Sequence, residues 1–308
     1  MNNYFKQILV TWVFLSLIVA NVGILSTQDD VAIRTRLHSL WLPDRWINDS
    51  IVSLIGGADS GQLTVPETLG VVQFDQGGIV RGDTTRKRLA LIFTGGDFYD
   101  GGSFIQSLLK AKKIHASFCF TGGFYRNPEN TTLLKQLAAD GHYLGAHSDQ
   151  HLLYCDWSKR DSLLVSHEQF VHDLFDNFAI MAKFDIKKED ARFFIPPYEW
   201  YNSTIAQWAK ELGLVLFNFT PGTGSNADYT TPEMSNYKSS DWIYRHIIAF
   251  EQSHPAGLNG FLLLLHIGTH PDRTDKFYLH LPKLLDYLAQ KNYELVRVDE
   301  LLTGSVDD

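Results

Sequence analysis

Residues 141–151 read GHYLGAHSDQH, and the rest of the chain is interpreted around this stretch. Its first six residues predict a short buried strand that ends at His147, four residues before His151. On a helix, this spacing places both imidazoles on one face, where they can bind one metal ion. The alternative is two surface histidines near the start of a helix. Because parallel α/β folds place their chemistry where strands end, the position favours a metal pair that takes a third ligand from elsewhere.

Strand-like and helix-like runs alternate from Gly77 to the end of the chain. Seven or so strands alternating with helices predict an α/β fold whose parallel sheet closes into a barrel. Residues 77–308 would form this domain. The expected strands lie near residues 89–93, 116–120, 141–147, 193–195, 214–219, 260–267 and 293–298, and the expected helices near 104–112, 131–139, 162–184, 203–212, 242–250 and 276–289.

The composition fits one large domain with an attachment at its amino end. The chain has 308 residues, of which 44% are hydrophobic, enough to bury one large core. Its net charge is −8 and it shows no basic stripe, so nucleic acid is a poor candidate partner. Cys119 and Cys155 are the only cysteines. A disulfide between them is open, although a free buried thiol is the favoured interpretation.

The first 27 residues are typical of an export signal. A single Lys6 precedes the apolar run 8–19, and small or polar residues follow it. The run is short for a spanning helix and lacks an obvious cleavage site, so a cleaved signal and a retained membrane tether both remain open. We therefore expect an exported protein, periplasmic or extracellular. Residues 28–76 are interpreted as an N-terminal extension.

From Gly77 to Leu302 the chain resembles the polysaccharide deacetylases, the NodB homology domain of carbohydrate esterase family 4. The resemblance rests on four motifs in the family's order: an acidic motif at residues 93–101, HSxxH at 147–151, Pro-Pro-Tyr at 196–198 and Leu-x-His at 264–266. It implies a distorted (β/α)7-type barrel of about seven strands.

The first and third motifs depart from the family pattern. Aligned from Thr94, the family's base aspartate falls on Gly96 and its metal-binding aspartate on Asp97, while Asp100 is the weaker candidate ligand with an alternative role as a helix cap. The arginine that tethers the base in the family is Ile195 here. Either another group is then the base or the mechanism is altered. Glu199 is the nearest spare carboxylate for that role, and the alternative is a rim residue that faces solvent.

The resemblance implies metal-assisted removal of acetyl groups from an N-acetylated polysaccharide or oligosaccharide. One divalent ion, expected to be zinc, would bind Asp97, His147 and His151, and Asp97 would double as base only if it keeps one oxygen free of the metal. His266 would protonate the leaving amine. The expected substrate contacts are the backbone N–H of Tyr198 at the oxyanion, Leu264 against the acetyl group, and Glu199 and Trp200 along the sugar.

Other side chains are candidates for the same cleft. Trp157, Trp200 and Tyr201 would stack on sugar rings or pack internally, and the polar loop 220–228 is long enough to be functional.

Two other functions stay open. One is a carbohydrate-binding descendant that lost catalysis with the base aspartate, and the other is an amidohydrolase acting on a small non-sugar amide.

Overall fold

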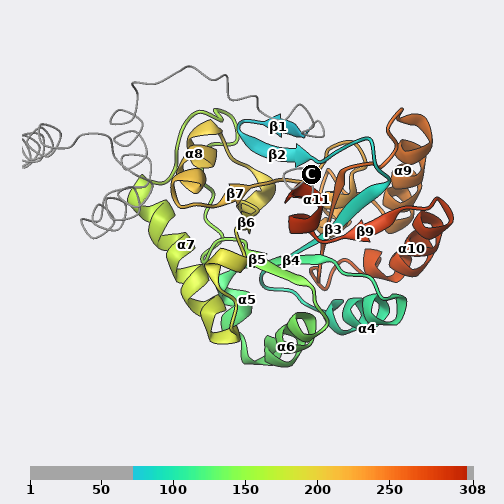
Figure 1. Ribbon diagram of the computed structural model, residues 1–308, viewed down its shortest axis with the longest axis horizontal. Coiled ribbons are helices and arrows are strands. Elements are labelled where there is room, and N and C mark those ends of the chain that lie inside the picture. Colours follow the sequence, from blue (N-terminus) through green and yellow to red (C-terminus); the bar gives the residue numbers. More distant parts are fainter. Residues whose placement is uncertain (1–71, 304–308) are drawn as a thin grey trace, which may run out of the picture. The chain divides into compact units, whose positions relative to one another are not determined.

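The computed structural model describes residues 72–303, in which strands and helices alternate as expected (Figure 1). The strands are β1 (Gln73–Asp75), β2 (Gly78–Arg81), β3 (Arg88–Gly95), β4 (Ser117–Phe120), β5 (Tyr143–Ala146), β6 (Phe193–Phe194), β7 (Val215–Leu216), β8 (Phe261–His266) and β9 (Glu294–Val296). The helices are α4 (Gly102–Lys112), α5 (Gly122–Arg126), α6 (Thr131–Ala139), α7 (His167–Met181), α8 (Ser203–Glu211), α9 (Ser240–Ser253), α10 (Leu281–Gln290) and α11 (Val298–Thr303).

Strand β3 is the centre of a five-stranded parallel sheet. The order is β5-β4-β3-β8, and β9 also pairs with β3 along its first residues. Thr94 of β3 lies beside Cys119 of β4 on one side and His266 of β8 on the other. All side chains from Leu89 to Phe93 are fully buried. A strand covered on both faces explains why this run is continuously apolar rather than alternating.

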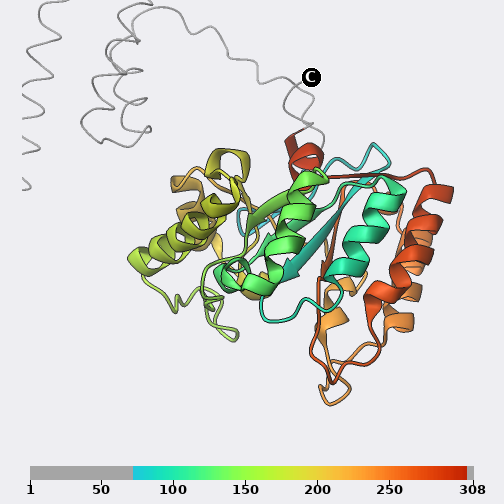
Figure 2. The same cartoon turned by 90° about the horizontal axis from the view of Figure 1, so that it is seen from below.

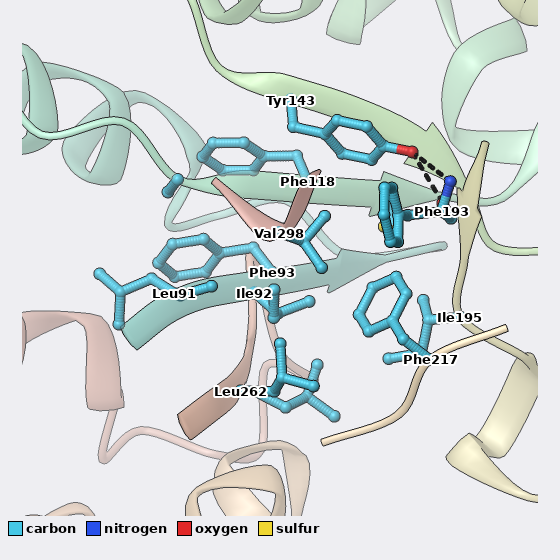
Figure 3. Close-up of a cluster of buried hydrophobic side chains, with 14 of the residues drawn as sticks. Leu91, Ile92, Phe93, Phe118, Tyr143, Phe193, Ile195, Phe217, Leu262 and Val298 are labelled. Atoms are coloured by element: carbon cyan, nitrogen blue, oxygen red, sulfur yellow. Dashed lines mark hydrogen bonds between the residues drawn. The ribbon is translucent and has the colours of Figure 1, made fainter. Parts of the chain in front are cut away.

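Short segments and isolated hydrogen bonds complete the barrel. The two-residue strands β6 and β7 pair in parallel, and a single parallel bridge joins Ile79 to Phe217 just after β7. The Thr220 N–H donates to the Leu262 carbonyl (3.0 Å), which connects this part of the barrel to β8. Between β5 and β6 the Tyr143 hydroxyl accepts from the Phe193 N–H (2.8 Å) and donates to its carbonyl (2.9 Å) (Figure 3). The expected distorted barrel is confirmed.

Apolar side chains fill the interior, and a short helix covers one end of it. Phe93 and Phe118 stack with ring centroids 5.0 Å apart, and they share the core with Ile195, Phe217 and Leu262 (Figure 3). Helix α11 lies at the starts of the strands, where the Val298 N–H donates to the Ser117 hydroxyl (2.8 Å; Figure 2). The carboxyl ends of the parallel strands, and the loops that follow them, therefore form the opposite end.

Helix boundaries agree with the sequence where capping residues mark them. Asn202 caps α8 by accepting from the Ile205 N–H (3.0 Å), as expected. The long helix expected over 162–184 is shorter, because Ser166 forms a capping box with Gln169 and α7 begins after it. Leu163 and Leu164 consequently lie outside the helix and are 37% and 50% exposed, so they do not extend its core-facing stripe.

The expected export segment, 1–27, and most of the extension, 28–76, lie outside the described residues. The last part of the extension contains β1, which pairs antiparallel with β2. Between residues 72 and 303 no helix is both long and apolar enough to cross a membrane. Cys119 and Cys155 are buried free thiols, as favoured from the sequence, and burial raises the pKa of each.

Candidate functional site

His147 and His151 lie in the loop that follows β5, and their side chains meet. Their Nε2 atoms are 3.3 Å apart. The segment is not helical, which corrects the geometry expected from the HxxxH spacing. Ser148 and His151 instead adopt left-handed conformations, with φ of 72° and 55°. This irregular backbone folds the loop back on itself, so that the two imidazoles converge without a helical turn between them.

Hydrogen bonds hold His147 in one tautomer. Its Nδ1 lies 3.0 Å from the Ile195 carbonyl oxygen, which can only accept, so Nδ1 carries the proton and Nε2 presents a lone pair toward His151. The His147 N–H donates to Asn177 Oδ1 on α7 (3.0 Å). Burial, followed by the nearby charges of His151 and His266, lowers the pKa of His147 well below its ordinary value. A neutral imidazole with a free Nε2 is the form that binds metals.

Asp173 on α7 fixes the rest of this loop. Its carboxylate accepts from the Ser148 hydroxyl (2.5 Å), the Gln150 N–H (2.9 Å) and the Tyr154 hydroxyl (2.8 Å). The Ser148 oxygen in turn accepts from the His151 N–H (2.9 Å). Burial lowers the pKa of His151 to about 4, assisted by the charge of His266 and opposed by that of Asp97.

His266 ends β8 and is paired with Asp228 from the polar loop after β7. Its Nδ1 is 2.6 Å from Asp228 Oδ1, and its backbone N–H donates to Oδ2 (2.9 Å). Burial lowers the pKa of His266, but the Asp228 charge and hydrogen bond, together with the Glu199 charge, outweigh it and raise the pKa overall. His266 is therefore suited to donate a proton. Leu264 lies two residues earlier on the same face of β8 and is fully buried.

Glu199 turns its carboxylate toward the histidine pair rather than standing at the rim. Its Oε1 lies 3.9 Å from His147 Nε2, and the side chain is 12% exposed. Tyr198 and Glu199 are consecutive left-handed residues, with φ of 58° and 52°. Burial raises the pKa of Glu199 to about 7; the His266 charge opposes this rise and the Asp228 charge adds to it.

The two aspartates of the first motif lie in different surroundings from those expected. Asp97 is exposed and forms no ion pair or hydrogen bond with either histidine. Asp100 does not cap α4, whose N-cap is Gly101. It accepts from the Thr269 N–H (2.8 Å) and lies 3.0 Å from Lys276 Nζ, so it connects two loops. The weaker candidate ligand is thus a structural residue.

Aromatic side chains continue outward from the histidine pair. The Tyr198 ring lies 4.3 Å from that of His151, and Trp157 meets Tyr198 edge-on at 5.8 Å. Trp157 stacks on Trp200 (5.5 Å, 26° between planes), and the Arg160 guanidinium lies 4.4 Å from the Trp200 ring. Tyr198 and Trp157 are 45% and 55% exposed. We call Tyr198, Trp157 and Trp200 the aromatic row.

The histidine pair fits a metal ion, but a complete ligand set is not in place. Nitrogen ligands about 2.0–2.1 Å from a tetrahedral zinc lie roughly 3.3–3.4 Å from each other, and the two Nε2 atoms are 3.3 Å apart. Within residues 72–303, however, no three His, Cys, Asp or Glu side chains lie close enough together to hold a metal. The predicted role of Asp97 as ligand and base stays a prediction.

Three supporting residues were not identified from the sequence. Asp228 belongs to the loop 220–228 that was expected to be functional, but nothing in the sequence pairs it with His266. Asp173 and Asn177 lie on the apolar side of α7, between Phe170 and Met181, and are 4% and 0% exposed. Polar residues at helical spacing within an apolar stripe are a signal that could have revealed them, because buried polar groups need partners.

Comparison with known proteins agrees with this geometry. Residues 81–217 match the polysaccharide deacetylase family model. A peptidoglycan-N-acetylglucosamine deacetylase from Bacillus cereus is 28% identical over 200 residues, covering 64% of this chain and 80% of the relative. The matched segment, residues 81–217, is thus similar to the polysaccharide deacetylase family.

Solved structures show the same fold at low identity. A carbohydrate esterase family 4 pseudoenzyme from Bacillus anthracis superposes with a TM-score of 0.57 at 16% identity, covering 74% of this chain and 69% of that one. The chitin deacetylase of Colletotrichum lindemuthianum also gives 0.57, at 19% identity, covering 74% of this chain and 93% of that one. These likenesses support the barrel, and they include both an enzyme and a pseudoenzyme.

Proposed function

We propose that this protein is a metal-dependent hydrolase that removes acetyl groups from an N-acetylated polysaccharide or oligosaccharide. The observation that carries the proposal is the convergence of His147 and His151, with Nε2 atoms 3.3 Å apart, in the same site as the His266–Asp228 pair. The match of residues 81–217 to the polysaccharide deacetylase family model supports the same reaction class.

The residues divide the chemistry between them. A zinc ion held by the two histidines would polarise the amide carbonyl and supply a water nucleophile near neutral pH. His266, kept protonated by Asp228, would donate its proton to the departing amine. Leu264 would contact the acetyl group, and the aromatic row would bind the sugar. The N-terminal sequence supports export, with or without a membrane tether, as part of the same proposal.

Metal content and acetate release test the proposal together. Wild-type protein should bind one zinc ion and release acetate from at least one acetylated glycan. The double variant His147→Ala, His151→Ala should lose both properties. His172, an exposed residue of α7, serves as the control: His172→Ala should keep both. Stoichiometric metal in the double variant would refute the assignment.

A second function is favoured by one specific observation. Gly96 and Ile195 stand where the family has its base aspartate and tethering arginine. A carbohydrate-binding protein without catalysis would fit this loss. Glycan binding measured by calorimetry, without acetate release under any metal condition, would identify it.

A further inference from the structure

The histidine pair lacks a carboxylate ligand, and two candidates lie near it. We propose that Glu199, rather than Asp97, is the third protein ligand of the metal held by His147 and His151. The inference rests on the metal dependence proposed above. The carboxylate ligand would then come from the third motif, whereas the family resemblance implies that it comes from the first.

The two carboxylates differ in burial and in partners. Glu199 is 12% exposed, and its one close polar side-chain contact among the described residues is His147 Nε2, at 3.9 Å. Asp97 is exposed on the loop after β3. A largely buried carboxylate without hydrogen-bond donors is costly, because it has lost much of its hydration without replacement. A cation between Glu199 and the two imidazoles would compensate for that loss, whereas solvated Asp97 needs no such partner.

The backbone conformation that turns Glu199 inward is energetically unfavourable. Left-handed conformations of non-glycine residues cost of order 1–3 kcal/mol each, and Tyr198 and Glu199 adopt them in succession. The turn is held by the Glu199 N–H, which donates to the Pro196 carbonyl (3.0 Å), and by Asn218 Nδ2, which donates to the Glu199 carbonyl (2.7 Å). Backbone strain of this kind persists only where surrounding contacts hold the conformation. In this turn, the strained conformation directs the Glu199 carboxylate toward the two histidines.

The resulting set would be two histidines and one glutamate. This combination holds catalytic zinc in other hydrolases and leaves the fourth position open for water or substrate. The Glu199–His147 separation of 3.9 Å exceeds the 3.3 Å between the two Nε2 atoms by 0.6 Å. To bind the same ion, the Glu199 carboxylate would have to move closer to the two imidazoles than it is in this structure.

Zinc affinity of the full chain tests the proposal without measuring turnover. Metal-free wild type and the variants Glu199→Gln, Asp97→Asn and Glu233→Gln would compete with a chromophoric chelator for zinc, exposed Glu233 serving as control. Glu199→Gln should weaken binding by about 100-fold or more, beyond the 10–100-fold typical of outer-shell partners. Asp97→Asn and Glu233→Gln should stay within about threefold of wild type, well below that range.

A second measurement reports the coordination directly. Cobalt(II) bound to wild type should give the visible spectrum of a low-coordinate site, and Glu199→Gln should change its intensity while Asp97→Asn should not. Glu199→Asp, which keeps the charge but shortens the reach, should bind zinc with intermediate affinity and covers the case in which the glutamine variant fails to fold. Loss of zinc in Asp97→Asn with retention in Glu199→Gln would overturn the proposal, as would retention in both. Absence of zinc from the wild type would instead refute the proposed function.

Discussion

Replacing Asp228 with asparagine tests whether the His266–Asp228 pair sets the protonation of His266. The asparagine keeps the shape of a side chain that is 3% exposed but removes its charge. Its amide must then face either the His266 backbone N–H or Nδ1, the two groups that the carboxylate now accepts from at 2.9 and 2.6 Å. Whichever way the amide lies, the imidazolium loses its charged acceptor, so the pKa of His266 should fall.

The size of the effect follows from the proposed role of His266 as general acid. A general acid contributes about 10²–10⁴-fold to turnover, so Asp228→Asn should lose at least about 10² near neutral pH. Activity should recover partly as the pH is lowered, because lower pH restores protonated His266. Asp161→Asn, an exposed carboxylate, is the matched control and should retain wild-type turnover.

The same substitution should also lower the free energy of unfolding, and this loss should be larger at low pH than at high pH. Since folding raises the pKa of His266, the pair stabilises the protein fully below the unfolded value of about 6.5, and this contribution is lost as pH rises through the folded pKa. A charge-assisted hydrogen bond contributes about 1.5–3 kcal/mol, so urea unfolding should separate wild type from Asp228→Asn by about that amount at pH 6 and by less at pH 9. Imidazole NMR titrations would measure the pKa itself. An unchanged His266 pKa, or turnover within threefold of wild type, would refute the reasoning.

Three further predictions concern other residues. Asp100→Ala should lower the free energy of unfolding by about 1–3 kcal/mol, because it leaves the buried Thr269 N–H without its acceptor, and it should not change zinc content; loss of zinc would show that the loop binds the metal. Trp157→Ala should weaken binding of long oligosaccharides about tenfold, equal to about 1.4 kcal/mol, yet spare the shortest substrates, and equal loss for all lengths by calorimetry would remove the aromatic row from substrate binding. His142 has a pKa lowered to about 4, chiefly by burial, and its Nδ1 accepts from the Ala116 N–H (3.0 Å), so the unfolded chain takes up its proton first as pH falls from 6.5. His142→Asn keeps an acceptor and should reduce the loss of stability between pH 6.5 and 4 by at most about 3 kcal/mol; identical acid unfolding curves would contradict this.

The sequence determined the strand ends well because buried parallel strands and helix caps leave local signals. The apolar run 89–93, the cap at Asn202 and the helix at residues 131–139 depend on burial and on neighbouring residues, and all three appear in the structure. The four motifs could be placed because each lies at the carboxyl end of a strand. Local pattern and resemblance together therefore predicted the barrel and the end of it at which the candidate site lies.

Side-chain direction within the loops was harder to predict, because it depends on residues far away in the chain. The spacing of His147 and His151 suggested a helix, but Asp173, more than twenty residues later, holds the loop in another shape. Glu199 could not be distinguished from a rim residue without the left-handed turn that carries it. Asp228 likewise lies 38 positions from His266. Such pairings require the three-dimensional structure.

The Tyr143 hydroxyl, which alone spans β5 and β6 at the Phe193 peptide, also determines how the barrel can open. Strand β3 has neighbours on both edges, so its amides should exchange with solvent only when the whole domain unfolds. The Phe193 amide is protected by one phenol, and Tyr143→Phe should speed its hydrogen exchange selectively, as mass spectrometry of peptides covering residues 193–195 would show. Two residues beyond lies the Ile195 carbonyl, which fixes the tautomer of His147. Opening of this edge would therefore also release the contact that orients the His147 imidazole, so the exchange rate of the Phe193 amide would report how often the candidate site comes apart.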